Sequence, residues 1–166
     1  MSTRWKRWAV AFVLTASLAA MSPVGEAAAR SKFVAKVNGR RFKSNKHVIL
    51  AFNTLGALSI AGAVVPHRVH GLVRAFGIVC PVPDLAVAVH TTLPCGADYY
   101  EQRLGVFVRN QWDTGTMLQV TIDSFDGTRV RGTFQGTLEM VGATHPQDPP
   151  AAVANGKFDV VLMALP

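Results

Sequence analysis

Hydrophobic residues along most of this chain recur at every second position, and this spacing constrains the fold more than any other feature of the sequence. The clearest case is RVRGTFQGTLEM at 129–140, where Val130, Phe134 and Leu138 share one face with two glycines and polar residues occupy the other. A period of two is typical of a strand that packs one face on a core and exposes the other to water. The sequence contains no long amphipathic helical period and no repeat of solenoid length.

Turn signals divide the chain into many short strands. Asn38-Gly39 separates 32–37 from 40–43, and Asp126-Gly127 separates 117–123 from 129–140. Both dipeptides are preferred in two-residue hairpin turns, which need positive φ. Further strands are expected at 47–53, 57–65, 69–79, 85–92, 103–109 and 157–164. The pattern predicts an all-β fold, as a single antiparallel β-sandwich or a partly closed β-barrel.

The first 29 residues have the composition of a secretory signal peptide. Three basic residues within positions 4–7 precede an apolar run at 9–20, and three alanines at 27–29 form a small-residue cleavage site. The apolar run is shorter than the roughly 20 residues of a membrane-spanning helix. We therefore expect a Sec-type signal peptide at 1–29, a periplasmic or extracellular all-β domain at 30–166, and no transmembrane segment after cleavage.

Cys80 and Cys95 are the only cysteines of the chain. In an oxidising compartment a single pair is most simply a disulfide. A redox motif would place the cysteines two residues apart, and a zinc site would need more Cys or His at short spacing. We predict a disulfide between them that ties the expected strand 85–92 at both ends.

Positive charge is concentrated at the start of the expected domain. Of the 14 Lys and Arg residues outside the signal peptide, seven lie within 30–46, where no acid occurs. The hairpin register places Lys36 opposite Arg41, and with Arg40 and Lys43 these cations form a candidate anion-binding surface. Its partner would be an anionic envelope component such as lipid head groups, a polyanionic glycan or extracellular nucleic acid. Alternatively, the charge only keeps a sheet edge from pairing with another molecule.

Sequence-specific binding of nucleic acid is not expected, because aromatic residues for base stacking are nearly absent among these cations.

Two short motifs lie at the ends of the expected domain. The run FVAKVNGRRF occupies 33–42, and VRGTFQGTL at 130–138 is followed by NGKFDV at 155–160. This combination resembles small secreted or lipid-anchored bacterial envelope proteins of uncharacterised function, with a V-N/D-G-x-x-F first hairpin and G-T-F-x-x-x-L and G-x-F-x-V terminal strands. The resemblance implies an all-β extracytoplasmic module and no catalytic residues. The lipidation cysteine of many such proteins is absent here, and the cysteine pair is not part of the pattern.

Residues with catalytic or metal-binding chemistry form no recognised motif. Serine-hydrolase, zinc-protease, phosphate-loop and EF-hand signatures are missing, so we predict no catalytic residue and no cofactor. We predict no metal site: the candidate ligands would be His67, His70 and His90, but residues three apart on a strand point to opposite sides, so the interpretation that we favour is surface histidines. A hydrolase would have to assemble its carboxylates from separate turns and strand ends, where the sequence places Asp84, Asp98, Glu101, Asp113, Asp123 and Asp126.

These observations favour a non-enzymatic binding or structural protein of the bacterial cell envelope. A small-ligand or metal carrier with a cavity inside a β-barrel is the first alternative, and a hydrolase with dispersed carboxylates is the second. Tyr99, Tyr100 and Trp112 would line a groove in a sugar-binding protein. The interpretation that we favour is that they cap the core with their polar tips outward.

Export predicts that the secreted protein begins at Arg30, because Ala27 and Ala29 occupy the two positions that signal peptidase reads as small. Mass spectrometry of the released protein measures this directly. A product that still carries Trp5 and Trp8 would contradict cleavage and make the apolar run an anchor.

Overall fold

The computed structural model describes residues 31–45, 48–66, 71–103, 109–113, 118–140 and 150–163. The expected signal peptide lies outside these ranges. The described residues form ten strands: β1 (Lys32–Val37), β2 (Arg40–Lys43), β3 (Ile49–Thr54), β4 (Ala57–Val64), β5 (Leu72–Pro81), β6 (Thr92–Arg103), β7 (Arg109–Asp113), β8 (Leu118–Phe125), β9 (Arg129–Met140) and β10 (Ala151–Val161). The all-β prediction is confirmed.

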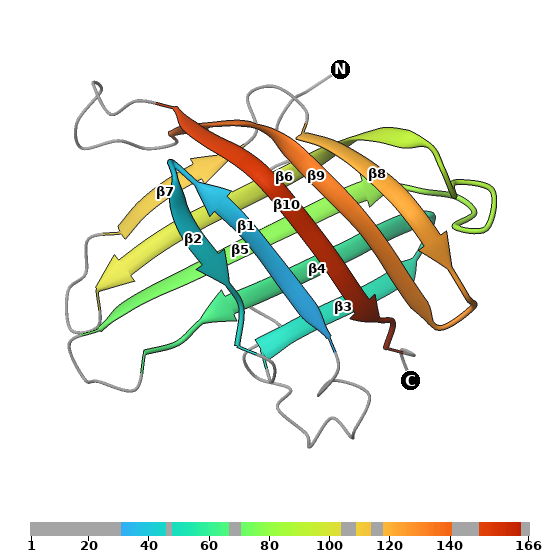
Figure 1. The fold of residues 1–166 in the computed structure, drawn as a ribbon, viewed down its shortest axis with the longest axis horizontal. Coiled ribbons are helices and arrows are strands. Elements are labelled where there is room, and N and C mark those ends of the chain that lie inside the picture. Colours follow the sequence, from blue (N-terminus) through green and yellow to red (C-terminus); the bar gives the residue numbers. More distant parts are fainter. Residues whose placement is uncertain are drawn as a thin grey trace.

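The ten strands belong to one antiparallel sheet with the order β2-β1-β10-β9-β7-β6-β5-β4-β3. β8 lies off this path and pairs with β6 and β9. The start of β6 pairs with β8 and its later part with β7, so β6 passes from one half of the sheet to the other. The sheet bends into two layers, with β1, β2, β8, β9 and β10 in front of β3 to β7 (Figure 1).

Three phenylalanines join the two layers. Phe33 of β1, Phe134 of β9 and Phe76 of β5 lie with their ring centroids 5.4–5.6 Å apart, and all three are buried. Contacts of this kind add about 0.5–1.5 kcal/mol per pair to the free energy gained by burying the rings. We call these residues the phenylalanine triad, since they form the centre of the core.

Glycines in the front layer make room for aromatic rings. A Cβ atom at Gly132 would overlap the Phe158 ring and the Thr121 carbonyl oxygen, and one at Gly156 would overlap the Phe134 ring. The front strands can therefore hold large side chains over a neighbouring backbone.

The segment between β5 and β6 differs from the expectation. Residues 85–92 were expected as a strand, but 85–88 form a turn in which Ala86 N donates to Asp84 Oδ1 (2.9 Å) and Ala88 N to Asp84 O (3.2 Å). The Asp84 side chain offers the backbone a local partner in place of a strand ladder, which is a common property of aspartate in turns. The strand follows instead at β6, where Cys95, Ala97 and Tyr99 face the core.

Two further boundaries differ. Residues 103 and 109 belong to β6 and β7, and the segment between them lies outside the described residues, so the single strand expected at 103–109 is wrong. The last strand begins at Ala151 rather than at residue 157. Asn155, which has a φ of 52°, and Gly156 form a bulge within β10, as the register shift against both neighbouring strands shows.

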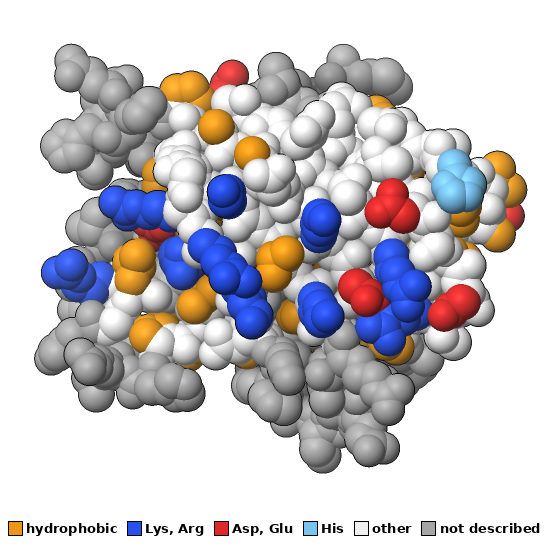
Figure 2. Space-filling view, in the orientation of Figure 1, with side chains coloured by type: hydrophobic (Ala, Val, Ile, Leu, Met, Phe, Trp, Pro, Cys, Tyr) orange, Lys and Arg blue, Asp and Glu red, His pale blue; other side chains and the backbone are white. Residues whose placement is uncertain are grey.

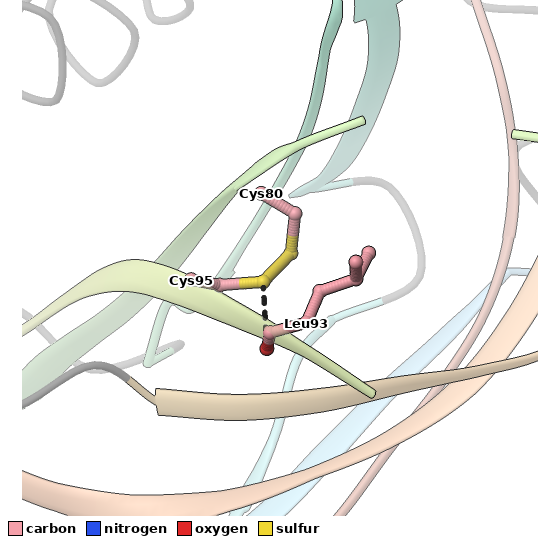
Figure 3. Close-up of a disulfide and its surroundings, with 3 residues drawn as sticks. All are labelled: Cys80, Leu93 and Cys95. Carbon is pink, nitrogen blue, oxygen red and sulfur yellow. Dashed lines mark hydrogen bonds between the residues drawn. A yellow bond between two sulfur atoms is a disulfide. The ribbon is translucent and has the colours of Figure 1, made fainter. Parts of the chain in front are cut away.

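The predicted disulfide is confirmed. Cys80 at the end of β5 is bonded to Cys95 of β6, and their Cα atoms are 4.4 Å apart (Figure 3). Cys95 Sγ lies 3.5 Å from the Leu93 carbonyl oxygen. The bond closes the β5–β6 loop rather than the strand that was expected between the two cysteines.

Neither outer strand of the sheet has a fully free edge. Arg74 Nη1 donates to the Arg41 carbonyl oxygen of β2 (2.9 Å), and Asn45 N donates to Ala63 O just beyond β2 (2.8 Å). At β3, the Ala51 carbonyl oxygen accepts a hydrogen bond from Met163 N (2.8 Å). Coverage of this kind protects a sheet from pairing with another chain.

The close packing of the front layer predicts that Gly132→Ala is destabilising. The new methyl group would meet a buried ring and a backbone oxygen, and overpacking of this kind reduces the free energy of unfolding by about 1–3 kcal/mol. Chemical denaturation measures the change, with Gly96→Ala as the control because only Val79 O lies near its Cβ position, at 3.9 Å. Equal stability of the two variants would contradict the packing described.

Candidate anion-binding face

The first hairpin has the register that its turn indicated. Asn38 and Gly39 adopt φ values of 48° and 75°, and Lys36 lies opposite Arg41. Ala35 and Phe42 are buried on the inner face. The alternate residues of both strands are therefore presented to solvent on the outer face.

Val34 is the centre of a lysine cluster on this outer face. Lys43 of β2 lies directly opposite Val34 on one side, and Lys157 of β10 lies opposite on the other. Lys32 and Lys36 occupy the same face two residues before and after Val34. Directly opposite residues have Cβ atoms about 4.5–5.5 Å apart, and residues two apart along a strand are separated by about 6.6 Å. We call these four exposed residues the lysine ring.

The lysine ring differs from the surface predicted from the sequence. Lys36, Arg41 and Lys43 share the outer face, but Arg40 lies opposite the buried Val37, so the register assigns it to the other face of the hairpin. Lys157 was missed because only the pairing of the first and last strands brings it beside Val34. The sequence did contain a signal for this pairing: the two motifs lie at the two ends of the expected domain, and the first and last strands often pair in a bent sheet.

Acidic residues do not neutralise the lysine ring. Asp159 lies opposite Lys32, but its carboxylate oxygen Oδ1 accepts hydrogen bonds from Arg129 Nε and from Arg131 Nε (3.3 Å). Partial burial favours the protonated carboxyl, yet the hydrogen bonds from the two arginines outweigh it and lower the pKa of Asp159. Among the described residues, no acid forms an ion pair with a member of the ring.

Apart from Arg41 and the group formed by Asp159 with its two arginines, the outer face beside the ring carries hydroxyl groups. The cross-strand row through Val34 and Lys157 continues into Thr133 of β9 and Thr121 of β8, whose hydroxyl lies 2.8 Å from that of Thr92. Lysine and arginine side chains gather over β1, β2 and β10 in Figure 2. The front layer thus presents the lysine ring beside a row of hydroxyl groups, with the arginines bound to Asp159 forming a separate charged group.

Histidines give no metal site among the described residues. His67 and His70 lie outside them, and His90 is an exposed residue with a φ of 65° at the end of the β5–β6 loop. The described part of the chain contains no group of three His, Cys, Asp or Glu side chains that could hold a metal ion. Both cysteines are oxidised to the disulfide.

Two of the dispersed carboxylates become neighbours. Asp98 of β6 lies opposite Asp113 of β7, and Asp113 lies opposite Glu139 of β9. All three belong to the face of the sheet opposite to Tyr99 and Trp112. They are neighbours on one sheet surface, whereas the carboxylates of a glycosidase flank the scissile bond from two sides.

The remaining carboxylates have local structural roles or lie apart. Asp126 Oδ1 accepts hydrogen bonds from Thr128 N (3.0 Å) and Arg129 N (2.7 Å), which lower its pKa and fix the β8–β9 turn. Glu101 Oε1 accepts a hydrogen bond from the Tyr99 hydroxyl (2.6 Å). Asp84 stabilises the turn that follows β5, and Asp123 is exposed on β8.

The aromatic candidates belong mainly to the core. Tyr99 and Trp112 are buried with ring centroids 5.5 Å apart, and burial, followed by the hydrogen bond to Glu101, raises the pKa of Tyr99. Tyr100 is half-buried on the opposite face of β6. The groove-lining interpretation of Tyr99 and Trp112 is therefore wrong. Both pack against the core as the favoured interpretation expects, but the Trp112 Nε1 atom is buried rather than turned outward.

Comparisons with family models, with curated proteins and with solved structures find no match for this chain. The resemblance to bacterial envelope proteins stays a prediction from the two terminal motifs. Within the described residues, no helix has the length and apolar character needed to cross a membrane.

Proposed function

We propose that this protein is a non-enzymatic binding protein that works outside the cytoplasm and binds an anionic component of the cell envelope through the lysine ring. The observation that carries the proposal is the arrangement of Lys32, Lys36, Lys43 and Lys157 around Val34 without an acidic partner among the described residues.

Mutual repulsion within the ring supports this function. Lys43 and Lys157 lie diagonal to Lys32 and Lys36 across the strands, within reach of long side chains, and Lys36 lies directly opposite Arg41, where like charges destabilise a sheet. A bound anion would remove this cost. The field of several cations on one face also raises the local concentration of anions.

The size of the interaction favours a partner with many charges. A basic residue near an anionic surface contributes about 1 kcal/mol, so four contribute about 4 kcal/mol, which corresponds to a Kd near 1 mM. A single small anion would hardly be retained at that affinity. A polymer or a surface would be retained, because it offers many anions in succession. Lysine also acts as a point charge, without the paired geometry by which arginine selects one carboxylate or phosphate.

The edge-protection alternative has less support. The Arg41 carbonyl oxygen is already covered by Arg74, and the chain beyond β2 is paired with Ala63. Of the four lysines only Lys43 belongs to the outer strand β2, and the other three lie on β1 and β10, away from that edge. Repulsion among lysines on the outer face would weaken the sheet without protecting its edge from pairing with another chain.

The other two functions have weaker support in the structure. A carrier needs space inside the fold, and the phenylalanine triad occupies the centre between the layers. A glycosidase needs carboxylates on two sides of a substrate, but Asp98 and Asp113 lie side by side on one face of the sheet, where Asp98 is buried.

Charge reversal on the ring provides the test. The double variant Lys36→Glu/Lys157→Glu should weaken binding to phosphatidylglycerol vesicles or to an immobilised acidic glycan by at least about tenfold, because each lost cation contributes about 1 kcal/mol. Co-sedimentation and column retention, measured on secreted protein whose mass shows that the signal peptide is absent, give the affinities. Binding should also fall steeply between about 0.1 M and 1 M salt, as the screening length shortens from about 10 to about 3 Å.

The matched control is Arg40→Glu/Arg103→Glu. This control changes the net charge by the same amount as the ring variant. Arg40 belongs to the β1–β2 hairpin, like Lys36, but neither Arg40 nor Arg103 belongs to the ring. The ring variant should lose binding, and the control should keep most of it. Equal losses would show that only net charge matters and would contradict a specific binding face.

A further inference from the structure

Two turns at the end of the molecule opposite to the β1–β2 turn carry exposed aliphatic side chains. The β3–β4 turn and the β5–β6 loop lie side by side there (Figure 1), where Val82 N donates to Gly56 O (2.7 Å). Leu55 and Val87 have relative exposures of 106% and 76%, the highest among the large hydrophobic residues that the structure describes. We call this pair and the two turns that carry it the apolar tip.

Leu55 occupies a backbone position that disfavours leucine. Its φ is 52° and that of Gly56 is 75°, nearly the same as the 48° and 75° of Asn38 and Gly39 in the first hairpin. Asparagine and glycine suit such a turn, whereas a bulky residue at positive φ is an outlier. Leu55 gains no compensating burial within this chain, so its presence at the tip points to a role outside the fold.

The tip is held in a fixed shape. The disulfide between Cys80 and Cys95 closes the base of the β5–β6 loop. Within the loop, the Thr91 hydroxyl donates to Ala88 O (2.6 Å), and His90 N donates to Ile122 O (2.7 Å). An exposed apolar side chain on a braced loop loses little conformational freedom when it is buried by a partner.

We propose that the apolar tip inserts into the interfacial region of a lipid bilayer. A stable protein–protein interface buries about 800 Å² on each partner, more than two short turns supply, whereas a bilayer takes up single aliphatic side chains without a complementary shape. The tip is also nearly uncharged: residues 54–57 and 81–91 contain only Asp84 and His90 as ionisable groups, and Asp84 Oδ1 is turned toward Ala86 N. Figure 2 shows hydrophobic side chains at this end and the cations mainly elsewhere on the face.

This surface is separate from the lysine ring, so the two proposals can fail independently. The β1–β2 turn and the tip lie at opposite ends of the long axis (Figure 1). Vesicles of phosphatidylcholine alone carry no net charge and therefore report on the tip without attracting the ring. The ring variant Lys36→Glu/Lys157→Glu should bind these vesicles like the unmodified protein.

The decisive variant is Leu55→Asn. It should reduce partition into phosphatidylcholine vesicles by roughly tenfold to a hundredfold, the equivalent of burying one leucine side chain. At the same time it should raise the thermal unfolding midpoint by roughly 2–6 °C, because asparagine suits the turn. A stabilised protein that has lost binding excludes misfolding as the cause. Val87→Asn should also reduce partition, and the two changes together should abolish it.

Leu72→Asn is the matched control, because Leu72 is also exposed (39%) but begins β5 at the end far from Cys80. It should leave partition unchanged. The proposal is overturned if the unmodified protein does not bind phosphatidylcholine vesicles, or if Leu55→Asn binds as well as Leu72→Asn. Self-association that depends on Leu55, measured by sedimentation without vesicles, would identify a second copy of the chain as the occupant and also overturn it.

Discussion

Contact among the three rings of the phenylalanine triad fixes which side of each front strand faces water. Phe33 and Phe134 reach Phe76 only when their own strands turn these residues inward. Side chains alternate along a strand, so Lys32, Val34 and Lys36 must then point outward. A slip of one residue would exchange the two faces and bury the lysines, at a large cost in free energy. The cationic face is therefore a consequence of the core.

The bulge in β10 has a similar effect on the last member of the ring. Ala151 and Val153 face the core, and unbroken alternation from them would also turn Lys157 inward. The extra residue at Asn155 shifts the alternation, so that Phe158 enters the core and Lys157 reaches the outer face beside Val34. One irregularity thus allows a single strand to serve both the core and the ring.

Local sequence signals predicted much of this structure. Alternation located β9 with its observed bounds, Asn38-Gly39 gave the register of the first hairpin, and the isolated cysteine pair indicated the disulfide. The β6 strand was missed because Leu85, Val87 and Val89 alternate like a strand, although the Asp84 side chain stabilises a turn there. Local sequence patterns could not place Lys157 beside Val34, because its neighbours are determined by pairing between strands that are distant in the sequence. The interpretation of His67 and His70 as surface histidines stays a prediction, since both lie outside the described residues.

Mapping of backbone amide shifts during titration with a soluble polyanion such as inorganic polyphosphate tests the binding face most directly. We predict that the largest changes occur in β1, β2 and the second half of β10, around Val34, and that amides of β3 to β5 change little. Shifts spread over all exposed cations, including Arg103, would indicate attraction by net charge alone and contradict a binding face built by strand register.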